Sequence, residues 1–130
     1  MKHIKLIAAA ALLMAAAPAF AVDWVYVAGN KRGADFYYDA HTIVRSGNQV
    51  TVWEKWDHSK DKALKEREIK LRRRYDCAER TVTLLHGIAY YPDGTNKSSA
   101  YETYEQEVTP IAPASLGEVM LEAVCEATAP

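Results

Sequence analysis

Between Ile69 and Cys77 the chain alternates apolar and charged side chains. The alternating positions form two interleaved sets: Ile69, Leu71, Tyr75 and Cys77 in the first, and Lys70, Arg72, Arg74 and Asp76 in the second. A repeat of two residues is typical of a β-strand that places one face in a core and the other in water. We therefore predict a strand over residues 69–77, which ends at a cysteine.

Runs of aromatic and β-branched residues predict the other strands of an antiparallel sheet. The expected strands, besides 69–77, cover residues 23–28, 36–38, 43–44, 50–56, 82–90 and 101–108. The polar segment 57–67 is expected to be a solvated loop. Because the apolar positions change parity after Cys77, we expect a bulge or bend near residues 78–80.

The C-terminal segment has the pattern of an amphipathic helix. Ser115 and Glu118 stand three residues apart just before an apolar run, which is the spacing of a capping box. Apolar residues then recur at helical spacing: Leu116, Val119, Met120, Ala123 and Val124. The predicted fold class is α+β, an antiparallel meander sheet of about six strands with one C-terminal helix packed on it.

The first 21 residues have the features of a cleavable secretory signal peptide. Two lysines flank the start of an apolar run over residues 4–17, and Ala19-Phe20-Ala21 ends the segment in a small-x-small cleavage site. A membrane anchor is the alternative, but the run is short for a spanning helix. Cleavage after Ala21 would leave residues 22–130 as a single exported domain with no membrane span. Of the 16 basic side chains, 14 remain in this domain against 17 acidic ones, a formal charge of −3.

Cys77 and Cys125 are the only two cysteines of the chain. In an oxidising compartment outside the cytoplasm, the simplest outcome for two cysteines is one internal disulfide. Such a bond would fasten the C-terminal helix to the strand over 69–77. Closing a loop of about 50 residues would stabilise the fold by about 4 kcal/mol. Two free thiols or an intermolecular bridge remain the alternatives.

Aromatic segments and the C-terminal region together carry a family resemblance. The segments concerned are Trp24, Phe36-Tyr37-Tyr38-Asp39, Trp53-Glu54-Lys55-Trp56-Asp57, Tyr75-Asp76-Cys77, Ile111-Ala112-Pro113-Ala114-Ser115 with Glu118, and Val124-Cys125. The order and spacing of the proline, the capping serine and the terminal cysteine are the most specific part. In these features the chain resembles the bacterial surface-adhesin protein E-like domain family.

The resemblance implies an exported domain in which several antiparallel strands pack against a C-terminal helix tied by a disulfide. It also implies adhesion, because the best-known member looks like an outer-surface adhesin for host matrix proteins such as vitronectin and laminin. One position departs from the family pattern, since Ala114 stands where the family would place glycine before the serine.

A basic segment and a large number of tryptophan and tyrosine residues indicate a binding surface. Segment 60–74 carries eight basic and three acidic side chains, a net charge of +5, whereas the chain has no basic residue after Lys97. The candidate binding surface comprises Trp53, Trp56, Lys70, Arg72, Arg74, Tyr90 and Tyr91. Two alternatives need no ligand: basic and acidic strands could pair across the sheet, and the aromatic rings could only pack on one another.

Catalytic motifs are absent from the sequence, which has no Gly-x-Ser-x-Gly, no Gly-rich phosphate loop and no paired-cysteine metal motif. We therefore expect no enzyme activity, no cofactor and no metal. The leading hypothesis is a non-catalytic binding module, periplasmic, secreted or held at the cell surface. It would bind a protein or glycan in the envelope or extracellular matrix, and no nucleic acid. The alternatives are a periplasmic inhibitor or accessory protein of an envelope hydrolase and a structural envelope protein, and a homodimer is left open.

Overall fold

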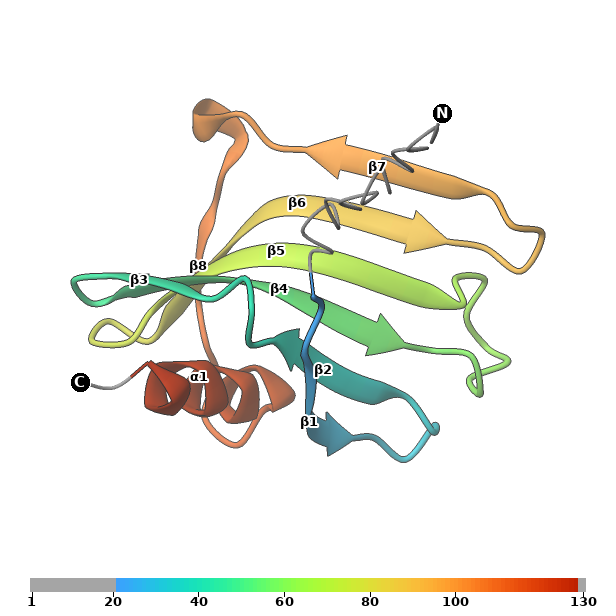
Figure 1. Ribbon diagram of the computed structural model, residues 1–130, viewed down its shortest axis with the longest axis horizontal. Helices are drawn as coiled ribbons and strands as arrows, with labels where there is room; N and C mark the ends of the chain where they lie inside the picture. The colour runs from blue at the N-terminus through green and yellow to red at the C-terminus, as the bar shows by residue number, and fades with distance from the viewer. Residues whose placement is uncertain (1–20, 129–130) are drawn as a thin grey trace, which may run out of the picture.

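The computed structural model describes residues 21–128 (Figure 1). The expected signal peptide, residues 1–21, lies outside the described residues except for Ala21. The elements in chain order are β1 (Trp24–Gly29), β2 (Asp35–Asp39), β3 (Val44–Ser46), β4 (Gln49–Asp57), β5 (Glu68–Asp76), β6 (Thr81–Tyr90), β7 (Asn96–Ala100), the 3-10 helix η1 (Thr103–Glu105), β8 (Val108–Pro110) and α1 (Leu116–Ala127). No helix among residues 21–128 is long and apolar enough to cross a bilayer.

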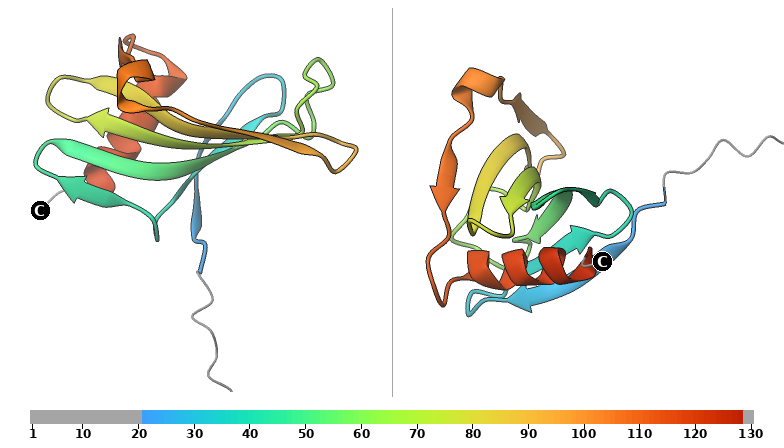
Figure 2. Two further views of the ribbon diagram at one scale, coloured as in Figure 1. Left: turned by 90° about the horizontal axis from the view of Figure 1, so that it is seen from above. Right: turned by 90° about the vertical axis from the view of Figure 1, so that its left-hand side faces the viewer.

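All strands belong to one antiparallel sheet. Its main order is β1-β2-β4-β5-β6-β7, and the short strands β3 and β8 pair with β4 and β6 respectively. The sheet has eight strands rather than about six because these two short segments also join it. Figure 2 shows that the sheet is curved and that α1 lies on the inner side of the curve. The predicted α+β class and the meander topology are confirmed.

The hydrophobic core lies between α1 and the middle of the sheet. Val50 and Val52 of β4 and Tyr75 of β5 are buried there together with side chains of α1, namely Met120, Leu121 and Val124. Alternate residues of a strand point to opposite faces. We call the face that α1 covers the inner face, and the opposite one the outer face.

The helix has the predicted N-cap and disulfide, but the Glu118 carboxylate accepts the Ala114 amide at 3.3 Å instead of the Ser115 amide that a capping box requires. Ser115 is the N-cap, and its Oγ accepts a hydrogen bond from the Glu118 amide at 3.2 Å. Cys77 and Cys125 form the predicted disulfide, with an S–S distance of 2.05 Å. Val119, however, is 45% exposed although it belongs to the predicted apolar stripe, because it lies at the edge of the contact between α1 and β1.

The change of parity after Cys77 comes from a hairpin turn, not from a bulge in one continuous strand. The register places Tyr75 of β5 opposite Val82 of β6, so the chain reverses direction between them. Arg80 in this turn adopts a positive φ of 55°. A register shift does occur between β5 and β6, but at Arg72 and Arg73.

The strand predicted over residues 101–108 is wrong. That segment contains η1, and the strand that returns along β6 is β7, residues Asn96–Ala100. β7 was missed because asparagine, lysine, serine and alanine have low strand propensity, and backbone pairing with β6 determines its conformation instead. β8 ends at Pro110, where the chain leaves the sheet for α1.

Candidate functional site

Three basic side chains of β5 lie in a line on the outer face. Leu71 and Tyr75 of the same strand are buried, so the residues that alternate with them point away from α1. These residues are Lys70, Arg72 and Arg74, which we call the cationic row. Cross-strand pairing places Trp53 of β4 and His86 of β6 on either side of Arg72.

Aromatic side chains flank the cationic row and contact its cations. The Nζ of Lys55, next to Lys70 across the sheet, lies 4.5 Å from the ring centre of Tyr37 and 5.0 Å from that of Trp24. The Nζ of Lys70 lies 5.1 Å from the ring centre of Tyr90. These distances are in the range of cation–π contacts, which are worth about 0.5–1 kcal/mol at exposed sites. Some of the aromatic rings therefore stabilise the outer face through contacts within the protein.

The cations of the row are not neutralised by the acidic segment that follows β7. Among residues 21–128, no ion pair joins segment 60–74 to the glutamates of residues 102–107. Lys70 has one distant partner, Glu68, at 3.9 Å. Within the same described residues Arg72 and Arg74 have no carboxylate partner. The acidic segment does not pair with β5, whose neighbours in the sheet are β4 and β6, and it contacts Arg74 through the neutral side chain of Gln106.

The structure separates the predicted surface residues into three places. Trp53 lies on the outer face, where its ring centre is 5.4 Å from that of His86. Trp56 points to the inner face, because its ring packs edge-on against Phe36 at 5.6 Å and its Nε1 donates to Glu54. Tyr91 lies in the turn after β6, where its backbone amide donates to the Thr95 carbonyl. Trp56 is therefore not adjacent to the cationic row.

A buried polar network on the inner face was missed at the sequence level. Arg73 Nε donates to Glu54 Oε2, and Arg73 Nη2 donates to Glu54 Oε1, both at 2.8 Å. The Tyr75 hydroxyl also donates to Glu54 Oε2. Glu54 is fully buried, and the Arg73 side chain is 14% exposed. Both charged residues occupy apolar positions of their strands, in line with Val52 and Leu71, and this pattern would have marked each of them as inward-facing.

Burial and charge shift the pKa values of this network. Burial raises the pKa of the Tyr75 phenol well above its ordinary value, and the neighbouring Glu54 charge raises it further. Burial by itself lowers the pKa of the Arg73 guanidinium, but the Glu54 charge and the hydrogen bonds to Glu54 and Tyr75 together raise it more strongly. Arg73 therefore stays charged, and Tyr75 stays protonated as a hydrogen-bond donor at neutral pH.

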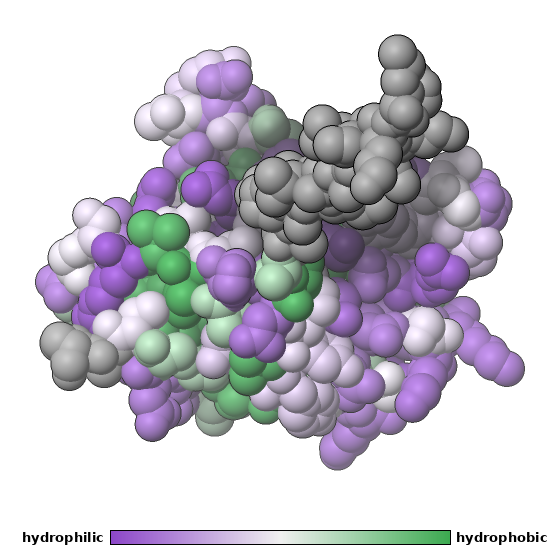
Figure 3. All heavy atoms as spheres, viewed as in Figure 1, coloured by the Kyte–Doolittle hydropathy of each residue, from purple (hydrophilic) through white to green (hydrophobic). Residues whose placement is uncertain are grey.

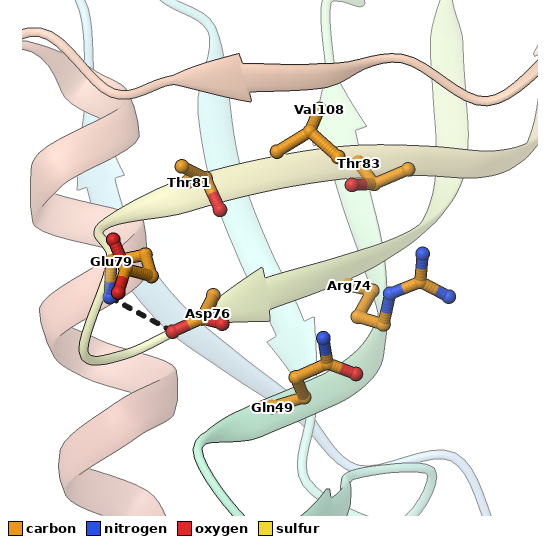
Figure 4. Close-up of a pocket in the computed structure, with 7 residues that line it drawn as sticks. All are labelled: Gln49, Arg74, Asp76, Glu79, Thr81, Thr83 and Val108. Atoms are coloured by element: carbon orange, nitrogen blue, oxygen red, sulfur yellow. Dashed lines mark hydrogen bonds between the residues drawn. The ribbon is translucent and has the colours of Figure 1, made fainter.

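A cavity of about 310 Å³, which we call the end pocket, lies at the end of the cationic row. It is lined by Gln49, Arg74 and Asp76 from β4 and β5, by Thr81 and Thr83 from β6, and by Glu79 and Val108 (Figure 4). Within residues 21–128, no three His, Cys, Asp or Glu side chains form a group that could hold a metal ion. The chemical character of the end pocket comes from its hydrogen-bonding side chains.

Exposed apolar side chains gather elsewhere on the surface. Figure 3 shows them near β3 and α1, which agrees with the high exposure of Val44 and Val119. An open groove of about 440 Å³ runs between β1 and α1, with Val25, Val27 and Val119 among its lining. No described residue covers this groove, and nothing in the structure shows what would. The homodimer left open by the sequence stays a prediction.

The fold and the outer face define a class: a small, disulfide-tied antiparallel sheet domain with a cationic and aromatic outer face. The sequence profile of the family described as surface-adhesin protein E matches residues 24–126. The match covers most of the 130 residues, and the chain belongs to this family. The resemblance and the overall fold inferred from the sequence are thereby confirmed.

Solved structures of Haemophilus influenzae protein E share the fold. Crystal form II has a TM-score of 0.58 and 16% sequence identity, covering 85% of this chain and 94% of that protein. The selenomethionine form has a TM-score of 0.57 and 16% identity, covering 85% and 92%. No curated protein sequence matches this chain. At such low identity the structural likeness shows the fold alone.

Proposed function

We propose that the chain is an exported, non-catalytic binding module with an adhesin-like role. Its membership of the surface-adhesin protein E family supports an exported or surface location and an extracellular partner. The leader predicted over residues 1–21 supports the same route, towards the periplasm, the medium or the cell surface. The partner is a protein or a glycan of the envelope or of the extracellular matrix.

The observation that carries this proposal is the set of unneutralised cations on the outer face. Arg72 and Arg74 have no carboxylate partner among the described residues, whereas Arg73 between them is paired with Glu54. A cluster of like charges attracts partners of the opposite sign and speeds their association. Trp53 beside Arg72 adds a large amphipathic ring, the type of residue that often dominates binding energy.

The test compares two double variants that lose the same charge in different places. Arg72→Gln with Arg74→Gln removes two cations of the row, and Lys31→Gln with Lys97→Gln removes two exposed cations outside the row and outside segment 60–74. The protein, purified after export, is immobilised and exposed to envelope extracts and matrix proteins. We expect the row variant to lose about tenfold or more in affinity for the captured partner, and the control to bind like the wild type.

Two outcomes would assign the function differently. Equal binding by the row variant and the control would exclude the outer face as the site. Inhibition of a lysozyme-type hydrolase by the wild type, lost in the row variant, would instead support the inhibitor alternative. Thermal unfolding of each variant checks that the fold is retained.

A further inference from the structure

Six of the seven residues that line the end pocket carry a side chain with hydrogen-bonding groups. Gln49 contributes an amide, Thr81 and Thr83 contribute hydroxyls, Asp76 and Glu79 contribute carboxylates, and only Val108 is apolar (Figure 4). Its volume of about 310 Å³ lies at the lower end of ligand pockets, which range over about 300–1,000 Å³. Such a lining suits a small group rich in hydroxyls, the size of one sugar ring, better than an apolar group.

Two side chains of the end pocket, Asp76 and Arg74, keep hydrogen-bonding groups that no described residue uses fully. Asp76 Oδ1 accepts the amides of Ala78 and Glu79 at 3.0 and 2.9 Å, whereas Oδ2 accepts no hydrogen bond from the described residues. Arg74 makes a single long bond, 3.4 Å, to Gln106 Oε1. The pocket thus offers an acceptor for hydroxyl groups and a charged, forked donor for a carboxylate or sulfate.

The end pocket opens onto the cationic row because Arg74 belongs to both. Arg74, Arg72 and Lys70 follow one another at every second residue of β5, a spacing of about 7 Å between successive Cα atoms. A linear polymer with an anionic group on successive units can contact these cations one after another. Trp53, opposite Arg72 in the register, provides a flat ring beside that path.

The position of β5 in the sheet disfavours an acidic peptide as the ligand. β5 pairs with β4 on one side and β6 on the other over its whole length, so its backbone groups are already hydrogen-bonded. An extended peptide binds a sheet most readily by adding a strand to a free edge. On the outer face of β5 a peptide would gain side-chain contacts only, whereas a polysaccharide needs no backbone partner.

We propose that the end pocket and the cationic row together bind an anionic polysaccharide. An acidic sugar ring occupies the end pocket with its carboxylate or sulfate on Arg74, and the following units run past Arg72 towards Lys70. This inference rests on the proposed function and names the ligand class of the same face.

Titration calorimetry with four probes tests the ligand class. The probes are sulfated heparin-derived oligosaccharides, oligogalacturonates that carry carboxylates only, neutral dextran oligosaccharides, and poly-glutamate of matched charge. We expect at least one anionic oligosaccharide to bind, and the two anionic probes to show whether sulfate or carboxylate is preferred. Neutral dextran and poly-glutamate should bind at least about tenfold more weakly.

Two pocket variants separate recognition in the end pocket from simple charge attraction. Arg74→Gln should weaken oligosaccharide binding about tenfold or more. Gln49→Leu, which leaves the net charge unchanged, should weaken it several-fold without affecting any residual binding of poly-glutamate. Lys31→Gln with Lys97→Gln serves as the control and should bind like the wild type. Unchanged unfolding temperatures establish that the variants are folded.

Three results would overturn the inference, and they are distinguishable. If poly-glutamate binds as tightly as the oligosaccharides and Gln49→Leu has no effect, the face attracts any polyanion and the end pocket is not a sugar site. If no oligosaccharide binds but a protein is still captured through Arg72 and Arg74, the ligand class is wrong and the proposed function stands. If the row variant changes no binding at all, both fail.

Discussion

Arg73 and Glu54 form a doubly hydrogen-bonded ion pair inside the fold, with both N–O distances at 2.8 Å. Arg72, the preceding residue of β5, lies on the opposite face and has no carboxylate partner among the described residues. Alternation along the strand therefore gives two neighbouring arginines different surroundings. One is neutralised within the core, and the other remains available to a ligand.

Breaking the Arg73–Glu54 pair should destabilise the fold strongly. Glu54→Gln leaves the buried guanidinium without its counter-charge, and the loss of a buried partner typically costs about 3–5 kcal/mol. Urea unfolding followed by tryptophan fluorescence measures this difference. Glu68→Gln, which removes the distant partner of Lys70, is the control and should cost under about 1 kcal/mol. Equal losses in the two variants would show that the buried pair contributes no more than a surface one.

Stability should fall in alkaline solution because of Tyr75. Its folded pKa is raised, chiefly by burial and then by the Glu54 charge, whereas in the unfolded chain it is about 10. Below pH about 10 both states keep the proton. Above it the unfolded state releases the proton first, so stability declines as pH rises towards the folded pKa, by up to about 1.4 kcal/mol per pH unit.

The comparison that isolates Tyr75 is with Tyr75→Phe. Urea midpoints measured from pH 8 to 11.5 should decline less steeply in this variant, because its phenylalanine has no proton to release. The variant should also be less stable at neutral pH, since Glu54 loses a hydrogen bond. Parallel pH curves for the two proteins would contradict the role given to Tyr75.

Removing the disulfide should lower stability without changing the fold. Cys77 and Cys125 are 48 residues apart in sequence, and closing such a loop stabilises the folded state by about 4 kcal/mol in the chain-entropy account. The double variant Cys77→Ser with Cys125→Ser, or the wild type with a reducing agent, should therefore unfold at a lower temperature. An unchanged melting temperature would mean that the bond adds nothing to the contacts of α1.

Replacing Ala114 by glycine should stabilise the protein. Ala114 has a φ of +55° just before the N-cap of α1, a conformation that costs a residue with a Cβ about 1–2 kcal/mol. Glycine avoids this cost but loses more entropy on folding, so the net gain should be about 1 kcal/mol or less. Thermal unfolding measures it, and Ala114→Val should shift the midpoint in the opposite direction. A lower midpoint for the glycine variant would contradict the account.

Binding through the cationic row should weaken as salt is added. The Debye length falls from about 10 Å at 0.1 M to about 3 Å at 1 M ionic strength, which screens exposed charges. Affinity of the wild type for its partner, measured across this range, should drop more steeply than that of Arg72→Gln with Arg74→Gln. Equal salt dependence would indicate that other charges attract the partner.

The elements with a clear periodic pattern in the sequence could be predicted. The strand at residues 69–77 alternates apolar and charged residues except at Arg73, and α1 has a capping serine and a helical apolar repeat, so both were placed within a residue or two. β7 was missed and the strand at 101–108 was wrong, because neighbour pairing overrode weak local preference there. The candidate binding surface stays a prediction, and the structure places Trp56 on the opposite face from Trp53.

The sequence by itself determined the alternating strand at residues 69–77, the capped C-terminal helix and the two cysteines available for a bond, because these depend on local periodicity and residue type. Only the tertiary structure decided which charges meet. Glu54 and Arg73 are 19 residues apart and pair because β4 and β5 lie side by side. Arg72 and Arg74 have no carboxylate partner among the described residues, because β5 is flanked by β4 and β6 and the segment after β7 contacts Arg74 through the neutral Gln106, an arrangement that local spacing does not encode.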